Sequence, residues 1–303
     1  MEANWALARK RERLEQRARI VQTIRAFFVD RAFLEVETPH LLPGNAPEAQ
    51  IEPVPAAGGY LHTSPELCMK RLLAAGYPRL FQICRCWRAA ERGRRHLPEY
   101  TMLEWYREGC DYHALMADCE ALFAALVPTE RLCWQGREID LTPPWERLTV
   151  RQAFARYADV DLDRALAAGT FDEVIALQIE PQLGQGRPIF LTEYPAACAA
   201  LARTKPGDPA VAERFELYVA GLELANAFSE LTDPAEQRQR FIAEQEEQRR
   251  NGKAPAPLPV KFLDELGNIA SAAGIALGVD RLVMLLGDAA SIDEVVAFVP
   301  EDL

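Results

Sequence analysis

Hydrophobic side chains recur at a helical spacing near the start of the chain. Leu7, Leu14, Ile20 and Ile24 are separated by charged residues, so residues 5–30 are predicted to form an amphipathic helix. Its basic residues form either a solvated face or a contact with an acidic partner. Five prolines follow between positions 39 and 55, and this density of proline excludes a long helix in that stretch.

Patterns typical of strands appear next. Residues 80–88 and 100–107 are rich in β-branched, aromatic and thiol side chains and flank a charged loop, which predicts an antiparallel pair. Residues 214–231 have the same character and are interpreted as a hairpin that turns at Ala220-Gly221. These strands are long enough to form the centre of a sheet.

Helical patterns fill much of the remaining chain. Residues 1–303 are therefore predicted to form a single α+β domain, a mostly antiparallel sheet flanked by helices, with a partly helical insertion at about 113–180. Further helices are expected over residues 113–126, 150–180 and 234–250.

Composition narrows the class of protein. The 34 basic and 45 acidic residues give a net charge of −11, which disfavours a protein whose main task is to grip nucleic-acid backbones. No apolar run approaches the roughly 20 residues that cross a bilayer, and residues 1–5 do not resemble a secretory signal. The 7 cysteines include no Cys-x-x-Cys pair, which argues against a disulfide framework. A cytoplasmic, reduced protein is expected.

Two polar groups share one face of the strand 100–107. Alternate side chains point the same way, so Glu104 and Tyr106 project together. A carboxylate beside a phenol can bind an ammonium group, although a solvated outer face would look the same in sequence. The loop before this strand holds four arginines and a histidine within nine positions, from Arg88 to His96. It suits either a triphosphate or a solvated hairpin tip.

The predicted hairpin carries acidic residues that could bind a metal. With a turn at Ala220-Gly221, Glu216 would pair with Ala225 and lie diagonal to Glu223. Two carboxylates this close repel unless a cation lies between them, which favours a magnesium site. Asn226 and Glu230 have the opposite parity, so they join the same face only if a bulge lies near residues 225–227.

The last polar element spans residues 274–282. A short strand ending at Gly278 is predicted to lead into a helix capped by Asp280, with Arg281 at its start. An arginine at a helix N-terminus attracts phosphate, because the helix dipole adds to its charge. This signal is weak on its own.

Together and in this order, these segments resemble the three signature motifs of class II aminoacyl-tRNA synthetases. The segment Phe33-Leu-Glu-Val-Glu-Thr-Pro39 is similar to motif 1, residues 81–106 to motif 2, and residues 274–281 to motif 3. The resemblance covers nearly the whole chain and is closest to the catalytic core of the lysine enzyme. Fewer than forty residues precede motif 1, so no anticodon-binding domain is expected.

Truncated relatives of the lysine enzyme that modify elongation factor P have this architecture. The chain shares their segments Thr63-Ser-Pro-Glu66, Thr101-Met-Leu-Glu-Trp-Tyr-Arg107, Glu213-Arg-Phe-Glu216 and Ala276-Leu-Gly-Val-Asp-Arg281. The resemblance implies that (R)-β-lysine is activated with ATP and Mg²⁺ and transferred to a lysine of elongation factor P. It also implies a homodimer, with no stable tRNA binding.

The resemblance assigns roles by position. The β-lysine pocket would be lined by Ser64, Glu66, Glu104, Tyr106, Asn226, Glu230 and Ala276. ATP would be bound by Arg88, Ala89, Ala90, His96, Leu97, Tyr100, Glu223, Leu224, Gly278 and Arg281, with Arg88 and Arg281 catalytic. Magnesium would be held by Glu216 and Glu223.

Two features depart from the lysine enzyme. Its motif 2 continues Arg-Asn-Glu where this chain has Arg88-Ala89-Ala90, so Glu91 can read adenine only if the loop shifts. Ala276 replaces a glycine, and one methyl group is worth about 1–3 kcal/mol of discrimination, which favours β-lysine over α-lysine. The alternatives are an enzyme that charges tRNA or another small acceptor, and a nucleotide-binding regulator that has lost catalysis.

Overall fold

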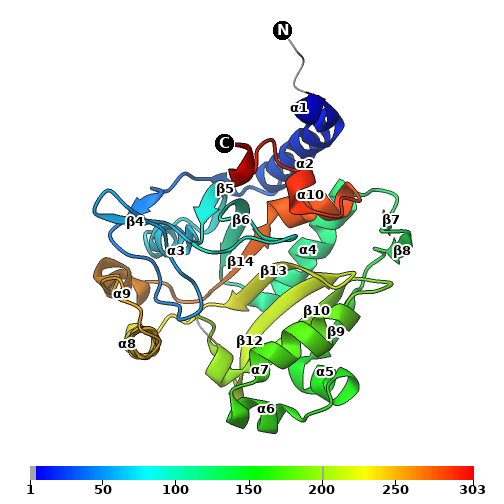
Figure 1. Ribbon diagram of the computed structural model, residues 1–303. Coiled ribbons are helices and arrows are strands. Elements are labelled where there is room, and N and C mark those ends of the chain that lie inside the picture. The colour runs from blue at the N-terminus through cyan, green and yellow to red at the C-terminus, as the bar shows by residue number, and fades with distance from the viewer. Residues whose placement is uncertain (1–4, 200) are drawn as a thin grey trace.

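The computed structural model describes residues 5–199 and 201–303 and is built around one large mixed sheet (Figure 1). Residues 1–4, part of the segment in which no leader was expected, lie outside the described residues. The strand order is β1-β5-β6-β14-β13-β12-β10-β9, with β11 beside β12. Neighbours pair antiparallel except for β1 with β5 and β10 with β9. The strands are β1 (Leu34–Glu35), β5 (Arg79–Trp87), β6 (Glu99–Glu108), β9 (Glu146–Thr149), β10 (Ile189–Pro195), β11 (Thr204–Lys205), β12 (Asp208–Val219), β13 (Leu222–Ser229) and β14 (Ala272–Gly278).

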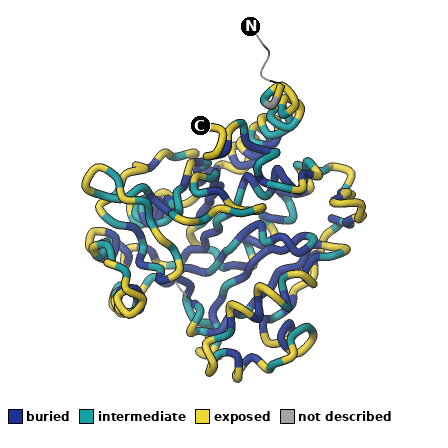
Figure 2. Tube along the Cα trace, in the orientation of Figure 1, coloured by how far each residue is buried: buried dark blue, intermediate teal, exposed yellow. Residues whose placement is uncertain are grey.

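Helices cover one face of this sheet with the largest hydrophobic core. Alternate residues of the central strands, such as Trp105, Phe215 and Ile275, point into it, while their neighbours in sequence face the other way. Buried residues are concentrated in the strands at the middle of the molecule (Figure 2). The covering helices are α2 (Arg11–Val29), α4 (Tyr112–Leu126) and α10 (Val279–Leu286).

The opposite face carries polar side chains at its centre and is only partly covered. There the helices α3 (Glu66–Ala74), α8 (Pro234–Arg250) and α9 (Val260–Leu266) pack together over a smaller core. A small sheet of β2 (Leu41–Leu42), β3 (Pro55–Ala56) and β4 (Gly59–Leu61) lies beside them. This arrangement leaves an opening over β6, β12, β13 and β14.

The region 113–180, expected to be a partly helical insertion, contains both helices and strands. Its first part includes the hairpin of β7 (Arg131–Trp134) and β8 (Arg137–Asp140), and then β9, which joins the large sheet. The helical segment expected at 150–180 is a series of short helices around a separate core: α5 (Val150–Tyr157), α6 (Leu162–Ala168), α7 (Phe171–Val174), η1 (Ile175–Ile179) and η2 (Glu180–Gln182). Three further short turns are η3 (Ala196–Cys198), η4 (Ile292–Glu294) and η5 (Pro300–Asp302).

Two local predictions need correction. The N-terminal helix is divided at Lys10 into α1 (Trp5–Arg9) and α2. Asp280 is not the cap of α10: it lies inside the first turn after Gly278, is buried, and forms an ion pair with Arg17 at 2.6 Å. It also accepts a hydrogen bond from the backbone N–H of Thr101 at 2.7 Å. The buried aspartate therefore fastens α10 to β6 and α2.

All seven cysteines are free thiols. In the described part of the chain, no helix combines the length and apolarity that a membrane crossing requires.

Candidate active site

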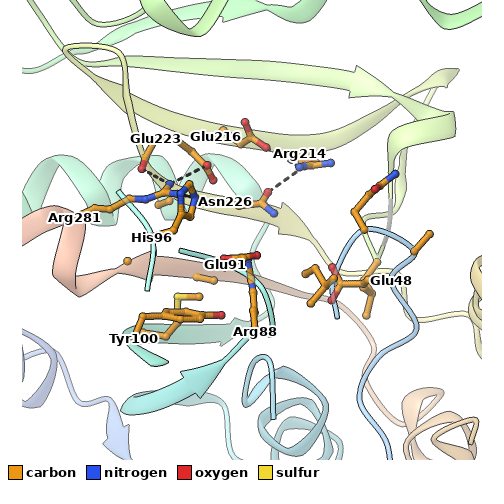
Figure 3. A pocket seen from close by; sticks show the side chains of 18 of the residues that line it. Glu48, Arg88, Glu91, His96, Tyr100, Arg214, Glu216, Glu223, Asn226 and Arg281 are labelled. Carbon is orange, nitrogen blue, oxygen red and sulfur yellow. Dashed lines mark hydrogen bonds and ion pairs between the residues drawn. The ribbon is translucent and has the colours of Figure 1, made fainter. Parts of the chain in front are cut away.

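A cavity of about 590 Å³ lies on the polar face of the sheet (Figure 3). Its floor consists of residues from β6, β12, β13 and β14, and its walls are the loop after β5, the segment 47–51 and α8. In Figure 3, Arg281, His96 and Glu223 lie together at one side, Glu48 lies at the other, and Arg88 lies between them.

One row of paired residues crosses five strands beneath this cavity. Glu216 pairs with Asn226, Asn226 with Ala276, and Ala276 with Glu104. Glu104 then pairs with Gln82. Directly paired residues point to the same face of a sheet, so residues distant in sequence converge on one line.

A bulge in the hairpin makes this row possible. Glu216 was expected opposite Ala225, but it pairs with Asn226, because the register shifts between Leu217 and Tyr218. The extra residue on β13 is Leu224, just before the segment where a bulge was required. Glu223 and Asn226, which have opposite parity, are thereby both placed on the cavity side.

Cationic groups gather at one end of the cavity. Arg281 donates hydrogen bonds to the backbone oxygen of Glu223 at 2.9 Å and to its carboxylate at 3.1 Å, and also contacts the His96 ring. Arg88 lies 5.3 Å from the centre of the Tyr100 ring. Partial burial lowers the pKa of His96, and Arg281 adds to this effect, so the imidazole is held neutral as a neighbour of the guanidinium. Of the predicted nucleotide contacts, the cavity is lined by Arg88, His96, Leu97, Tyr100, Glu223, Leu224, Gly278 and Arg281.

The arginine-rich loop does not turn all of its cations toward the cavity. Arg92 forms ion pairs with Asp293 at 3.0 Å and with Glu301 at 2.9 Å, and Arg94 donates to the backbone oxygen of Ala290. These two arginines fasten the loop to the C-terminal segment. Arg88 and Arg95 of the same loop line the cavity, so some of its arginines are placed to meet a triphosphate and others are not.

The two alanines after Arg88 are not among the described residues that line the cavity, and their contact with ATP stays a prediction. Ala90 adopts a left-handed backbone with a φ of 62°, which reverses the chain at this point. The reversal brings Glu91 to the cavity, where it lies 3.6 Å from Arg88. Glu91 thus occupies the side of the cavity from which the resemblance expected Ala90 to act.

Glu216 lies among donors at the back of the cavity. Its carboxylate accepts hydrogen bonds from Tyr194 at 2.5 Å, Tyr218 at 2.6 Å and Arg214 at 2.6 Å. Burial raises its pKa; Arg214 opposes the rise, and Glu223 adds to it. An ionised carboxylate has about four lone-pair sites, so one remains for a cation shared with Glu223. The carboxylate oxygens of Glu216 and Glu223 are of the kind that a magnesium ion takes as ligands.

Five of the predicted lysine-pocket residues lie beside the cavity floor in a cluster that we call the carboxylate cluster: Ser64, Glu66, Glu104, Tyr106 and Glu230. Ser64 and Tyr106 donate hydrogen bonds to the Glu104 carboxylate at 2.6 and 2.7 Å. Burial, reinforced by Glu66, raises the pKa of Glu104 to about 8. Burial likewise raises the pKa of Glu230 to about 8, although Lys70 opposes the rise. Asn226 and Ala276 connect this cluster to the open cavity.

Two residues that the sequence reasoning missed hold the carboxylate cluster together. Lys70 is fully buried, with its ammonium 2.6 Å from Glu66 and in contact with Glu230. Gly274 pairs with Tyr106, and a Cβ atom at this position would overlap the Tyr106 ring and the Glu230 carboxylate. The four-residue spacing of Glu66 and Lys70 on a helix was the available signal for Lys70.

Glu48 is a third residue that was missed. It lines the cavity opposite the cationic end, on the segment between β2 and β3. Burial raises its pKa to about 7, while Arg88 opposes the rise. The backbone of its neighbour Ala49 donates to Glu244 on α8 at 2.7 Å, which fixes this wall of the cavity.

Comparison of the sequence with known proteins identifies the family to which the chain belongs. The family model of class II tRNA synthetases (D, K and N) matches residues 4–302. The chain is 40% identical to the elongation factor P–(R)-β-lysine ligase of Pseudoalteromonas translucida, over 97% of both chains. It is 39% identical to the ligase of the same name from Erwinia tasmaniensis, over 98% of this chain and 97% of that one. For the Vibrio atlanticus ligase the identity is 38% over 98% of both. The chain therefore belongs to the class II tRNA synthetase family, and within it to the group of the elongation factor P–(R)-β-lysine ligases.

Proposed function

We propose that this protein activates (R)-β-lysine with ATP and transfers it to a lysine side chain of elongation factor P. The observation that carries the proposal is that a cationic cavity and a cluster of carboxylates lie next to each other on one face of the sheet. The cavity presents Arg88 and Arg281, which suit phosphates, and the carboxylate cluster presents Glu104 and Glu230, which suit ammonium groups.

In the first step, the carboxylate of β-lysine attacks the α-phosphorus of ATP and pyrophosphate leaves with the bonding electrons. Arg88 would hold the α-phosphate and Arg281 the γ-phosphate, so that the attacking and leaving oxygens stay in line. His96 would add a neutral hydrogen-bonding group, and Tyr100 would lie against the adenine. A magnesium ion, held by Glu216 and Glu223, would neutralise phosphate charge.

In the second step, the neutral ε-amine of the acceptor lysine attacks the carbonyl carbon of the aminoacyl-adenylate. A C–N bond forms, the C–O bond to AMP breaks, and AMP leaves with the electron pair while the nitrogen loses a proton to water. The product is an amide on the acceptor. The protein mainly positions the reactants and neutralises charge in both steps.

Several finer points belong to the same proposal. Ala276, between Asn226 and Glu104 in the row, would favour β-lysine over α-lysine, because its methyl group narrows the pocket beside the substrate backbone. The protein would act as a cytoplasmic homodimer through the motif 1 region.

The experiment that tests the proposal is ATP–pyrophosphate exchange with (R)-β-lysine, with α-lysine and without amino acid. Exchange that requires β-lysine is expected. Exchange with α-lysine alone would overturn the substrate preference but keep the reaction class. No exchange in folded protein would favour a regulator that binds nucleotides without reacting.

A further inference from the structure

Lys70 is a buried cation in contact with the carboxylate cluster, and the proposed reaction gives it no role. It lies on α3, four residues after Glu66, and its side chain has no solvent exposure. Its ammonium contacts the Glu66 and Glu230 carboxylates and lies 5.1 Å from the centre of the Phe228 ring. Burying an ammonium group costs free energy unless carboxylates match its charge, and here Glu66 and Glu230 do so.

The charges of the cluster do not balance without a ligand. Glu66, Glu104 and Glu230 can carry three negative charges, and among the described residues Lys70 is the one cation in direct contact with them. When all three are ionised, two of these charges remain for a ligand to match, whereas in the empty site Glu104 and Glu230 hold protons below about pH 8. The second oxygen of Glu230 is also buried and accepts no hydrogen bond from any described residue.

We propose that Lys70 is a positioning residue that holds Glu66 and Glu230 and leaves the ionised carboxylate cluster with two negative charges for its ligand to match. The site would therefore prefer a substrate carrying two ammonium groups over one carrying a single ammonium group. This inference rests on the proposed function, since it concerns how the same pocket selects its amino acid. Lys70 would act on the substrate through Glu66 and Glu230, which it holds in place.

The surroundings of Lys70 support an electrostatic role. Burial disfavours the ammonium form, but Glu230 and Glu66 outweigh burial, and the pKa of Lys70 lies above its ordinary value. Lys70 in turn opposes the rise in the pKa of Glu230. The charged and titratable groups that face this pair are Glu66 on α3, Glu104 and Tyr106 on β6, and Glu48 beyond Glu66.

Two matched variants separate charge from packing. Lys70→Met keeps the length of the side chain and removes the charge, whereas Lys70→Arg keeps the charge and changes the shape. We would measure the KM for (R)-β-lysine and for 3-aminohexanoate, which lacks the terminal ammonium, by pyrophosphate exchange between about pH 6 and pH 9. Without Lys70, the pKa of Glu230 would rise further, so ammonium groups would bind its ionised form only at higher pH.

For Lys70→Met, the KM for β-lysine should rise about tenfold near neutral pH, and its pH dependence should move up by about one unit. The preference for the diammonium substrate should fall as well. Lys70→Arg should keep the pH dependence of the native protein. An unmoved pH dependence in Lys70→Met, or a larger defect in Lys70→Arg than in Lys70→Met, would assign Lys70 to packing alone. A lower KM in Lys70→Met would show that Lys70 competes with the substrate.

A second variant covers the case in which Lys70→Met does not fold. Lys70→Gln removes the charge but can still donate hydrogen bonds to Glu66 and Glu230. It should fold and show the same upward shift in the pH dependence of KM, whereas a packing role predicts the native pH dependence. Exchange by the native protein is the control: its absence would refute the proposed function, while native exchange with an unmoved Lys70→Met profile would refute only the role of Lys70.

Discussion

The two ends of the site recognise charge in different ways. The phosphate end uses guanidinium groups on a loop and at the start of α10, which stay cationic at any physiological pH. The carboxylate cluster instead lies on β6, just after β13 and at the start of α3. Its Glu104 and Glu230 are nearly inaccessible to solvent and have pKa values of about 8. The phosphates of ATP therefore bind a site whose charge does not change with pH, whereas an ammonium substrate binds carboxyl groups that must first lose their protons.

This difference predicts that each end can be damaged separately. Changes at the phosphate end should lower the rate of adenylate formation at all pH values, because they remove a charge needed in the transition state. Changes in the carboxylate cluster should act on the KM for the amino acid and should depend on pH.

Removal of a phosphate-binding cation should have the largest effect. Arg88→Ala should lower the exchange rate about a hundredfold to a thousandfold, since one preorganised charge at the reacting phosphate is lost. Pyrophosphate exchange at saturating β-lysine would measure this. The matched control is Arg94→Ala on the same loop, whose side chain donates to the backbone of Ala290 away from the cavity. Equal losses in both variants would contradict the assignment.

Gly274→Ala should damage the carboxylate cluster selectively. The added methyl group would overlap Tyr106 and Glu230, and overpacking of this kind costs about 1–3 kcal/mol. The KM for β-lysine should rise about tenfold to a hundredfold, with little change in the KM for ATP. Gly186→Ala, where the space for a methyl group is open, is the control. A rise confined to the KM for ATP would reverse the placement of the two ends.

The pH dependence should separate the ends without any mutation. Glu104 and Glu230 are protonated below their pKa values of about 8, so the KM for β-lysine should fall about tenfold as the pH rises from about 7 to 9. The KM for ATP should not follow this change. A flat profile for β-lysine would show that the carboxyls are already ionised at neutral pH.

The same pKa shifts predict a stability effect in the empty protein. The pKa values of these carboxyls are higher in the folded state than the ordinary value of 4.5, so the folded state binds more protons between about pH 4.5 and pH 8. Their contribution to the free energy of unfolding should therefore decrease as the pH rises through this range. Denaturant unfolding of native protein and of Glu230→Gln would measure it, and a variant with the native slope would contradict the shift.

The smallest effect is expected at Ala276. Ala276→Gly should shift the ratio of kcat/KM for α-lysine over β-lysine by about fivefold toward α-lysine, at the low end of what one methyl group contributes. Exchange with each amino acid measures the ratio. A shift toward β-lysine would mean that the methyl group does not narrow the pocket against α-lysine.

The sequence pattern predicted the antiparallel pairs β5–β6 and β12–β13, because strand character and the turns between strands depend on neighbouring residues; the pairing of β14 with β6 and β13 was not predicted. The register of the hairpin was wrong by one residue beyond Glu223, since the extra residue at Leu224 has no distinctive side chain to mark it. The left-handed backbone at Ala90 was not predicted either, because this conformation is rare for alanine.

Partners across the fold were harder to predict than residues within a motif. The motif 2 residues Glu104 and Tyr106 were found from their spacing. The buried ion pair of Lys70 with Glu230, by contrast, joins residues 160 positions apart, and it forms only once α3 packs against β6 and β5. The need for a glycine at position 274 is likewise explained only by the positions of Tyr106 and Glu230, which leave no room for a Cβ atom.

The most direct test of the central claim is the intact mass of elongation factor P after incubation with this protein, ATP, Mg²⁺ and (R)-β-lysine. The account predicts that elongation factor P gains the mass of one β-lysyl residue, and that omission of ATP or of β-lysine abolishes the gain. Unmodified elongation factor P, together with lysylation of tRNA added to the same reaction, would contradict it.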